Sequence, residues 1–204
     1  MRGAVYIAFG EPARTEARLS IETLLQFNPG LSIAVISNEP LPLKGIVHVI
    51  DPQQDAGGRW QKVQLDGLSP FCHTLYLDAD TRIRADLSAG FRMLEDGWEL
   101  VITPSEHQGG TWLWHVGAED RAAVLEEWPC KPLQLQGGMF FFRKCDAIRR
   151  LFEAWQDEWL RFRDQDQGAL LRALAKTPVR VWILGRPWNG GSLVDHRFGR
   201  AKRR

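Results

Sequence analysis

The chain is organised around one stretch, Ser69-Pro70-Phe71-Cys72-His73-Thr74-Leu75-Tyr76-Leu77-Asp78-Ala79-Asp80-Thr81. Its β-prone run ends abruptly at two carboxylates that are separated by one small residue. In an extended backbone, residues i and i+2 project to the same side, so Asp78 and Asp80 are expected together at the mouth of a strand. Two such oxygen donors suit Mg²⁺ or Mn²⁺ bound to a phosphate, although an acidic turn that caps the strand would give the same pattern.

Composition limits the class of protein. A chain of 204 residues with 44% hydrophobic content suits one sizeable domain, and a formal net charge of +1 argues against a globally basic protein. The three cysteines, Cys72, Cys130 and Cys145, are scattered without metal-ligand spacing, which indicates reduced thiols and a cytoplasmic protein. No apolar run is long enough to span a bilayer, so no transmembrane segment is expected.

Hydrophobic periodicity predicts alternating strands and helices. A strand at 4–9, a helix after Pro12 that ends at Phe27 and a strand at 31–36 indicate a parallel, doubly wound start. Further strands are predicted at 46–50, 74–77, 100–103, 139–142 and 179–184, and helices from 57 onward and at 118–128, 145–162 and 168–174. Residues after Pro187 are expected to be irregular and basic. We therefore predict an α/β fold over 1–204, a single domain with a Rossmann-like mixed, mainly parallel sheet and helices on both faces.

Four segments stand in a recognisable order. Lys62 and the stretch at 69–80 come first, Gln136-Gly137-Gly138-Met139 is second, and Asp166-Gln167 is third. The fourth, His196-Arg197-Phe198-Gly199-Arg200-Ala201-Lys202, fits His-x-x-Gly-x-x-Lys. Over nearly the full length, the chain thereby resembles the nucleotide-sugar glycosyltransferases of the GT-A fold, most closely the retaining enzymes of glycosyltransferase family 8. It departs from the family where Arg203-Arg204 stand in place of the usual Pro-Trp.

The resemblance implies a GT-A-type domain in which residues 187–204 form a closing C-terminal loop. It implies a metal-dependent enzyme that moves a sugar from a nucleoside diphosphate, with a UDP-sugar expected, to an acceptor hydroxyl with retention. The leaving diphosphate is dianionic, so the main task is charge neutralisation by Mn²⁺ or Mg²⁺. Asp78, Asp80 and His196 are the implied metal ligands.

The remaining site residues divide by role. Asp166 and Gln167 are expected at the reacting face of the sugar, with Asp166 the better chemical candidate, while a helix N-cap at Asp164 or Asp166 is a compatible alternative. Gly137 and Gly138 either bring backbone amides to the sugar or form an ordinary turn. Donor binding is expected at Phe9, Gly10, Arg59, Lys62, Asp78, Gln136, Gly137, Gly138, Gly199 and Lys202.

The acceptor and the class of function leave alternatives open. A saccharide or glycoconjugate is the ordinary expectation, with Trp112, Trp114 and His115 as candidate contacts. The basic tail allows a hydroxylated base in modified DNA as a different acceptor. A catalytically inactive nucleotide-sugar-binding protein is a further alternative. A sugar-1-phosphate nucleotidyltransferase is disfavoured because the segment at 9–14 is poor in glycine.

Overall fold

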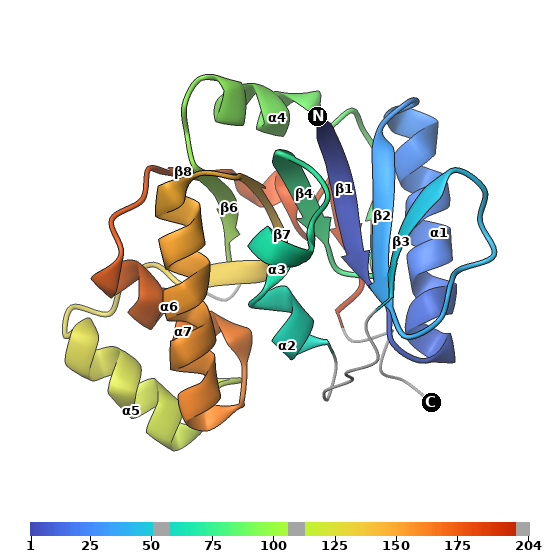
Figure 1. The fold of residues 1–204 in the computed structure, drawn as a ribbon. Coiled ribbons are helices and arrows are strands. Elements are labelled where there is room, and N and C mark those ends of the chain that lie inside the picture. Colours follow the sequence, from blue (N-terminus) through green and yellow to red (C-terminus); the bar gives the residue numbers. More distant parts are fainter. Residues whose placement is uncertain (51–57, 106–112, 199–204) are drawn as a thin grey trace.

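The protein was analysed as a computed structural model that describes residues 1–50, 58–105 and 113–198 (Figure 1). Seven strands form its central sheet in the order β3–β2–β1–β4–β7–β6–β8. They are β1 (Arg2–Ile7), β2 (Ser32–Ser37), β3 (Ile46–Ile50), β4 (His73–Leu77), β6 (Leu100–Pro104), β7 (Leu135–Arg143) and β8 (Val181–Ile183). Strand β7 runs antiparallel to both of its neighbours and every other pairing in this sheet is parallel. The predicted mixed, mainly parallel sheet is confirmed.

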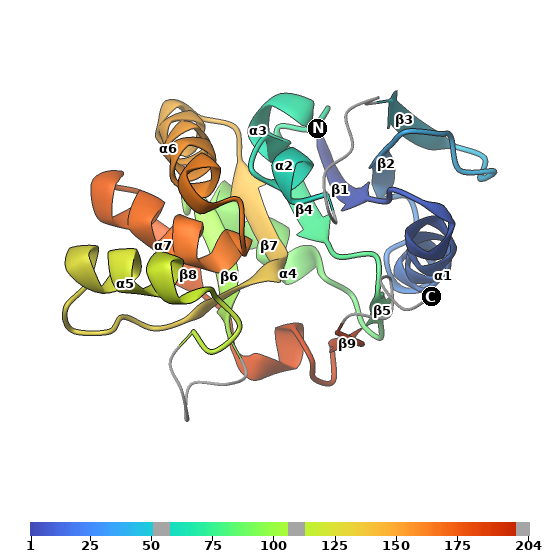
Figure 2. The ribbon, with the colours of Figure 1, turned by 90° about the horizontal axis from the view of Figure 1, so that it is seen from below.

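Helices cover both faces of the sheet (Figures 1 and 2). One face packs against α1 (Glu11–Phe27) and α4 (Ser88–Glu95), and the other against α2 (Arg59–Lys62), α3 (Leu65–Leu68), α6 (Asp146–Phe162) and α7 (Asp166–Lys176). Helix α5 (Ala118–Glu127) packs on α7. Strand β7 shows why both faces are covered, because Phe140 and Phe142 enter the core with α6 while Met139 and Phe141 enter the core with α1 and α4.

A second, two-stranded sheet lies next to the carboxyl ends of the parallel strands, and Figure 2 looks onto it. Strand β5 (Thr81–Ile83) pairs antiparallel with β9 (Val194–His196), with Thr81 opposite His196. The short 3₁₀ helix η1 (Arg186–Trp188) precedes β9. The prediction of an irregular chain after Pro187 is therefore wrong at β9, because a strand of three residues is too short to give a period-2 signal.

Several predicted boundaries also need correction. Gly137 and Gly138 lie inside β7 and do not form a turn before it. Helix α7 begins at Asp166 with Gln165 as its N-cap, so the N-cap interpretation of Asp164 and Asp166 is wrong. Helix α4 and strand β5 were not predicted from the hydrophobic pattern.

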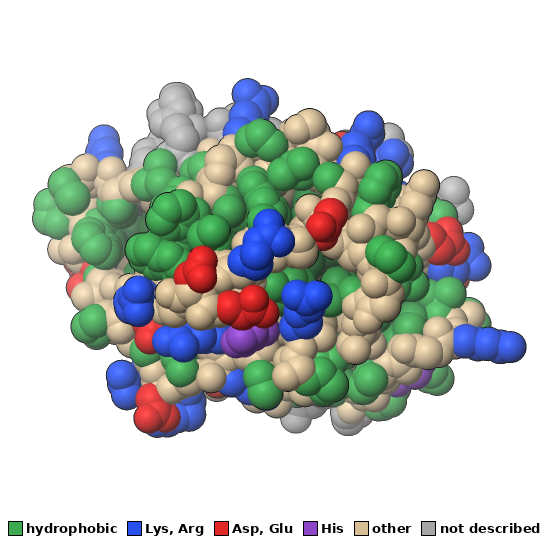
Figure 3. All heavy atoms as spheres, turned by 90° about the horizontal axis from the view of Figure 1, so that it is seen from above, with side chains coloured by type: hydrophobic (Ala, Val, Ile, Leu, Met, Phe, Trp, Pro, Cys, Tyr) green, Lys and Arg blue, Asp and Glu red, His purple; other side chains and the backbone are tan. Residues whose placement is uncertain are grey.

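The surface of the described residues carries charges of both signs. On the face seen in Figure 3, which lies at the opposite end of the strands from the β5–β9 ribbon, Lys and Arg side chains are interspersed with Asp and Glu among apolar ones. Within the described ranges, no helix is both long enough and apolar enough to cross a membrane.

Candidate metal and donor site

The two aspartates of the central stretch converge through a turn. The backbone N–H of Asp78 still bonds to Gly138 O of β7 at 2.8 Å, but the chain then turns, and both the backbone N–H and the hydroxyl of Thr81 donate to Asp78 O. Asp80 lies within this turn and is 5% exposed. The carboxylates therefore come together as predicted, although the cause is a turn that reverses the chain and not the alternation of an extended strand.

His196 reaches the aspartates through the β5–β9 pairing. Its Nε2 lies 3.2 Å from Asp80 Oδ1 and 3.6 Å from Asp78 Oδ2, and the backbone N–H of Arg197 donates to Asp80 O. One ligand atom from each of the three side chains lies within 4.8 Å of the other two. Ligands about 2.1 Å from one ion and at right angles to each other lie about 3 Å apart, so this set of two carboxylates and one imidazole fits a Mg²⁺- or Mn²⁺-sized cation.

The two oxygens of Asp78 face different partners. Oδ1 accepts a hydrogen bond of 2.6 Å from the Tyr76 hydroxyl and lies 3.2 Å from Lys62 Nζ, which leaves Oδ2 toward His196. Burial and the Asp78 carboxylate together raise the pKa of Tyr76, so this hydroxyl keeps its proton and acts as a donor. Tyr76 was not among the predicted site residues, although its i−2 spacing from Asp78 could have indicated it.

Lys62 is a buried cation shared by two carboxylates. Its Nζ also lies 3.4 Å from Asp166 Oδ2, so this side chain links Asp78 to the start of α7. Burial alone would lower the pKa of Lys62, but the charges of Asp166 and Asp78 outweigh burial and raise it. In the same way, burial opposes the ionisation of Asp166, yet Lys62 and Arg59 lower its pKa. The pair is therefore held in its ionised form.

Asp166 and Gln167 occupy the first turn of α7. The indole N–H of Trp155 on α6 donates to Asp166 O at 2.9 Å, which fixes the start of the helix. Gln167 Nε2 donates to Gln136 Oε1 at 3.1 Å, so two predicted site residues meet here. Gln167 Oε1 is buried and has no hydrogen-bond partner among the described residues. An unpaired buried carbonyl is costly, which suits a group that meets a ligand.

The glycine pair of β7 gives these side chains their space. A Cβ at Gly137 would lie 2.3 Å from Asp166 Oδ2, and a Cβ at Gly138 would lie 2.2 Å from His196 Cε1 and 2.9 Å from Asp78 Oδ2. Any larger residue would collide with the site's own side chains, which adds a reason for these glycines that was not predicted.

The other predicted residues lie around this cluster or outside the described chain. Gly10, with φ 79°, is the N-cap of α1, and Phe9 packs partly buried against the core. Arg59 donates to Gln165 Oε1 at 2.9 Å, next to Asp166 in sequence. Trp114 is 60% exposed, and its ring centroid lies 5.6 Å from that of His115. Gly199, Lys202 and Trp112 lie outside the described residues.

Comparisons with known proteins support the fold. The sequence matches no protein-family model and no curated protein. The structure is similar to mouse xyloside xylosyltransferase 1 in its apo form (TM-score 0.61, 13% identity, covering 93% of this chain and 87% of that one). It is also similar to galactosyltransferase LgtC in complex with donor and acceptor sugar analogs (TM-score 0.63, 14% identity, covering 93% of this chain and 75% of that one). A third similar structure is apo GlyE of Streptococcus pneumoniae TIGR4 (TM-score 0.62, 14% identity, covering 92% of this chain and 46% of that one). The fold is thus that of GT-A glycosyltransferases.

Proposed function

We propose that this protein is a metal-dependent glycosyltransferase, similar to the retaining enzymes of glycosyltransferase family 8, that uses a UDP-sugar donor. The observation that carries the proposal is the convergence of Asp78, Asp80 and His196 at the carboxyl ends of the parallel strands, within 4.8 Å of one another. Ligands of α/β sheets bind at these ends. The similarity to solved glycosyltransferases supports the same class of reaction.

In this proposal the negative charge of the leaving diphosphate is neutralised by a metal ion bound at the two aspartates. Asp78, Asp80 and His196 hold a Mn²⁺ or Mg²⁺ ion, which when bound supplies Lewis-acid stabilisation of the departing diphosphate. Lys62 pairs with Asp78 Oδ1 and so holds that oxygen away from the ion site. The sequence prediction that Gly199 and Lys202 close over the diphosphate is part of the same proposal.

Retention is proposed to depend on the first turn of α7. Asp166 is ionised and paired with Lys62, so it stabilises positive charge at the anomeric carbon better than it attacks that carbon. Gln167 Oε1, which lacks a partner among the described residues, is the oxygen we place against the reacting face of the sugar. The sugar is transferred to the acceptor hydroxyl, whose proton leaves with the diphosphate.

We propose a saccharide or glycoconjugate as the acceptor. The exposed ring of Trp114 can stack on a sugar ring, and the related fold of LgtC was solved with an acceptor sugar analog. No observation on the described residues favours a modified DNA base.

Calorimetric titration of UDP, with and without Mn²⁺, tests the donor and metal assignments. Wild type is expected to bind UDP at least about tenfold more tightly with Mn²⁺, and Asp80→Asn is expected to lose this gain because the ligand set loses a charge. Asp86→Asn, which changes an aspartate on an exposed segment, is the matched control and should behave as wild type. Failure of UDP and of the other nucleoside diphosphates to bind with any metal would contradict the proposal. A panel of UDP-sugars, with the anomeric configuration of the product read by NMR, then tests retention.

A further inference from the structure

A buried amide contacts the imidazole of His196 on the side opposite the aspartates. Asn189 follows η1 and is 2% exposed, and its Oδ1 lies 2.7 Å from His196 Nδ1. Its Nδ2 donates to Thr103 Oγ1 at 3.1 Å, where Thr103 is fully buried near the end of β6. The contact is therefore one link in a chain of polar groups that runs from β6 through Asn189 to β9.

The chemistry of these atoms selects one form of the ring. An amide oxygen can only accept, so His196 Nδ1 carries the proton that is donated to it. In a neutral ring, Nε2 then bears a lone pair, and it faces Asp80 Oδ1 at 3.2 Å and Asp78 Oδ2 at 3.6 Å. In this form, three electron-pair donors point at one another without a proton between them, an arrangement that suits a bound cation.

The local fold holds Asn189 in place for this contact. Its backbone N–H donates to Arg186 O, and the N–H groups of Gly190 and Gly191 both donate to Val194 O. These bonds fold the chain back on itself so that β9 delivers His196 beside Asn189. The ring is further restricted by Phe198, which stacks on it with centroids 4.0 Å apart, and by Gly138 at Cε1. Packing thus fixes the orientation of the ring, and Asn189 Oδ1 faces its Nδ1.

We infer that Asn189 is a positioning residue of the candidate metal centre, which holds His196 in the Nδ1–H tautomer so that Nε2 presents its lone pair to a divalent cation. Without the amide oxygen, the proton is drawn to Nε2, where the Asp80 carboxylate accepts it, and the metal-binding atom is blocked. This inference rests on the metal dependence in the proposed function. It assigns to a residue outside the ligand set the choice of which nitrogen binds the metal.

The direct measurement is ¹⁵N NMR of the imidazole nitrogens in metal-free protein, at a pH where the rings are neutral. The chain has five histidines, so His196→Ala assigns the signal. Wild type is expected to show His196 protonated at Nδ1, and Asn189→Leu is expected to move the proton to Nε2. A wild-type signal from the Nε2–H form would overturn the inference without use of any Asn189 variant.

Titration of Mn²⁺ alone gives the energetic test. Asn189→Leu is expected to weaken Mn²⁺ binding about 10- to 100-fold. Asn189→Asp keeps an acceptor oxygen and should bind close to wild type, and the milder Thr103→Val should fall between them. In a His196→Ala background, Asn189→Leu should have no further effect, because the tautomer no longer matters.

The outcomes separate the two proposals. An equal loss from Asn189→Leu with and without His196 would mean that Asn189 acts only through general packing, and would overturn the inference. Normal Mn²⁺ binding by Asn189→Leu would do the same while leaving the metal site intact. Absence of Mn²⁺ binding by wild type would overturn the metal centre of the proposed function and this inference with it.

Discussion

Gly138 determines how closely the candidate metal ligands approach the sheet. Its missing side chain leaves room for His196 Cε1 and Asp78 Oδ2, which come from β9 and from the turn after β4. Gly137 gives the same room to Asp166. Adjacent residues of a strand project to opposite faces, so this pair lets side chains reach the backbone of β7 from both sides.

At the residue scale, we predict that Gly138→Ala weakens Mn²⁺ binding by about tenfold or more, because a Cβ would displace His196 and Asp78 from their shared position. Calorimetric titration of Mn²⁺ measures the effect. Gly67→Ala on α3 is the control, since a Cβ there meets nothing within 4 Å. Unchanged Mn²⁺ affinity in Gly138→Ala would show that the site tolerates the methyl group, and the close-approach argument would be wrong.

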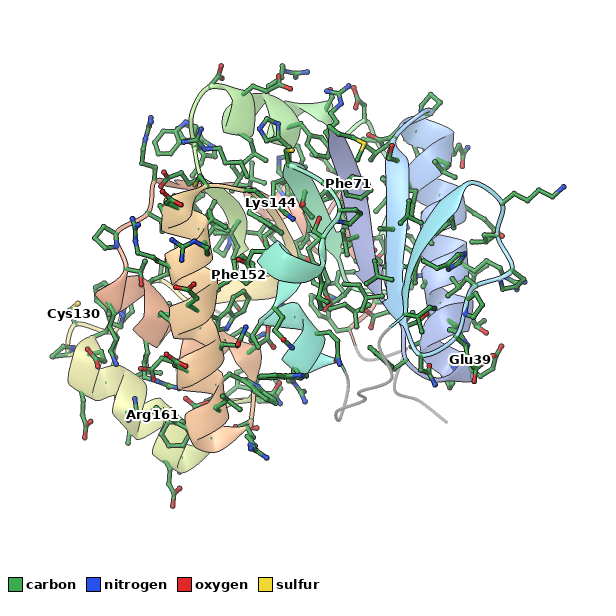
Figure 4. All side chains as sticks on the ribbon, viewed as in Figure 1. Glu39, Phe71, Cys130, Lys144, Phe152 and Arg161 are labelled. Atoms are coloured by element: carbon green, nitrogen blue, oxygen red, sulfur yellow. The ribbon has the colours of Figure 1, made fainter. Side chains whose placement is uncertain are left out.

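At the scale of elements, a buried ionic network joins helices α5, α6 and α7. Arg172 of α7 is fully buried, donates to Glu158 Oε2 of α6 at 2.7 Å and pairs with Asp120 of α5. Lys176 of α7 and Arg161 of α6 also bond to Glu158, and Arg161 is labelled in Figure 4. Phe152, directed from α6 toward the sheet in Figure 4, secures the same helix to the core. The network thereby anchors α7, whose first turn holds Asp166.

Glu158 gives this network a pH dependence. Burial opposes its ionisation, but hydrogen bonds from Lys176, Arg172 and Arg161 outweigh burial and lower its pKa from 4.5 to about 2. A carboxyl whose pKa is lower in the folded state contributes stability that is fully present above pH 4.5 and is lost as the pH falls toward 2. This lowering of the Glu158 pKa corresponds to about 3 kcal/mol of folding stability.

We therefore predict that Glu158→Gln is less stable at pH 7 and loses stability less steeply between pH 4.5 and 2 than wild type. The difference between the two proteins isolates Glu158 from the other carboxyl groups that titrate in this range. Urea unfolding at a series of pH values measures it. Glu153→Gln, at an exposed position on the same helix, should follow wild type. Equal slopes for Glu158→Gln and wild type would contradict the assigned pKa.

At the scale of the whole molecule, the site exists only when distant segments are assembled. Residues from 62 to 196 contribute to it, so a ligand that binds there is expected to bind the folded chain alone. In the presence of Mn²⁺, UDP at about 100 times the Kd of UDP would then add about 2.7 kcal/mol to the free energy of unfolding and raise the Tm by roughly 5–10 °C. Chelation of the metal with EDTA should reverse most of this rise.

Thermal unfolding followed by circular dichroism measures this effect. Asp80→Asn should show little rise with Mn²⁺ and UDP although its fold is retained. A rise of the same size in Asp80→Asn would place the binding elsewhere on the molecule. The boundary of one domain at 1–204 and the roles of the individual site residues stay predictions until such measurements are made.

The sequence by itself determined the α/β class, the mainly parallel sheet and the short list that contains Asp78, Asp80 and His196. Hydrophobic periodicity is a local signal, so it could predict the strands and helices that have a buried face along several residues. The Asp-x-Asp pair and His-x-x-Gly-x-x-Lys are readable because their spacing is short. What these patterns share is that neighbours in sequence carry the information.

Only the tertiary structure decided how the site is assembled. The β5–β9 pairing and the Lys62 bridge between Asp78 and Asp166 each depend on contacts between residues far apart in the chain. Asn189 stayed hidden in the sequence for the same reason, since an amide acquires its role only from the atom that it faces. Hydrogen bonds and ion pairs act over about 3 Å, and only folding fixes which groups come within that distance.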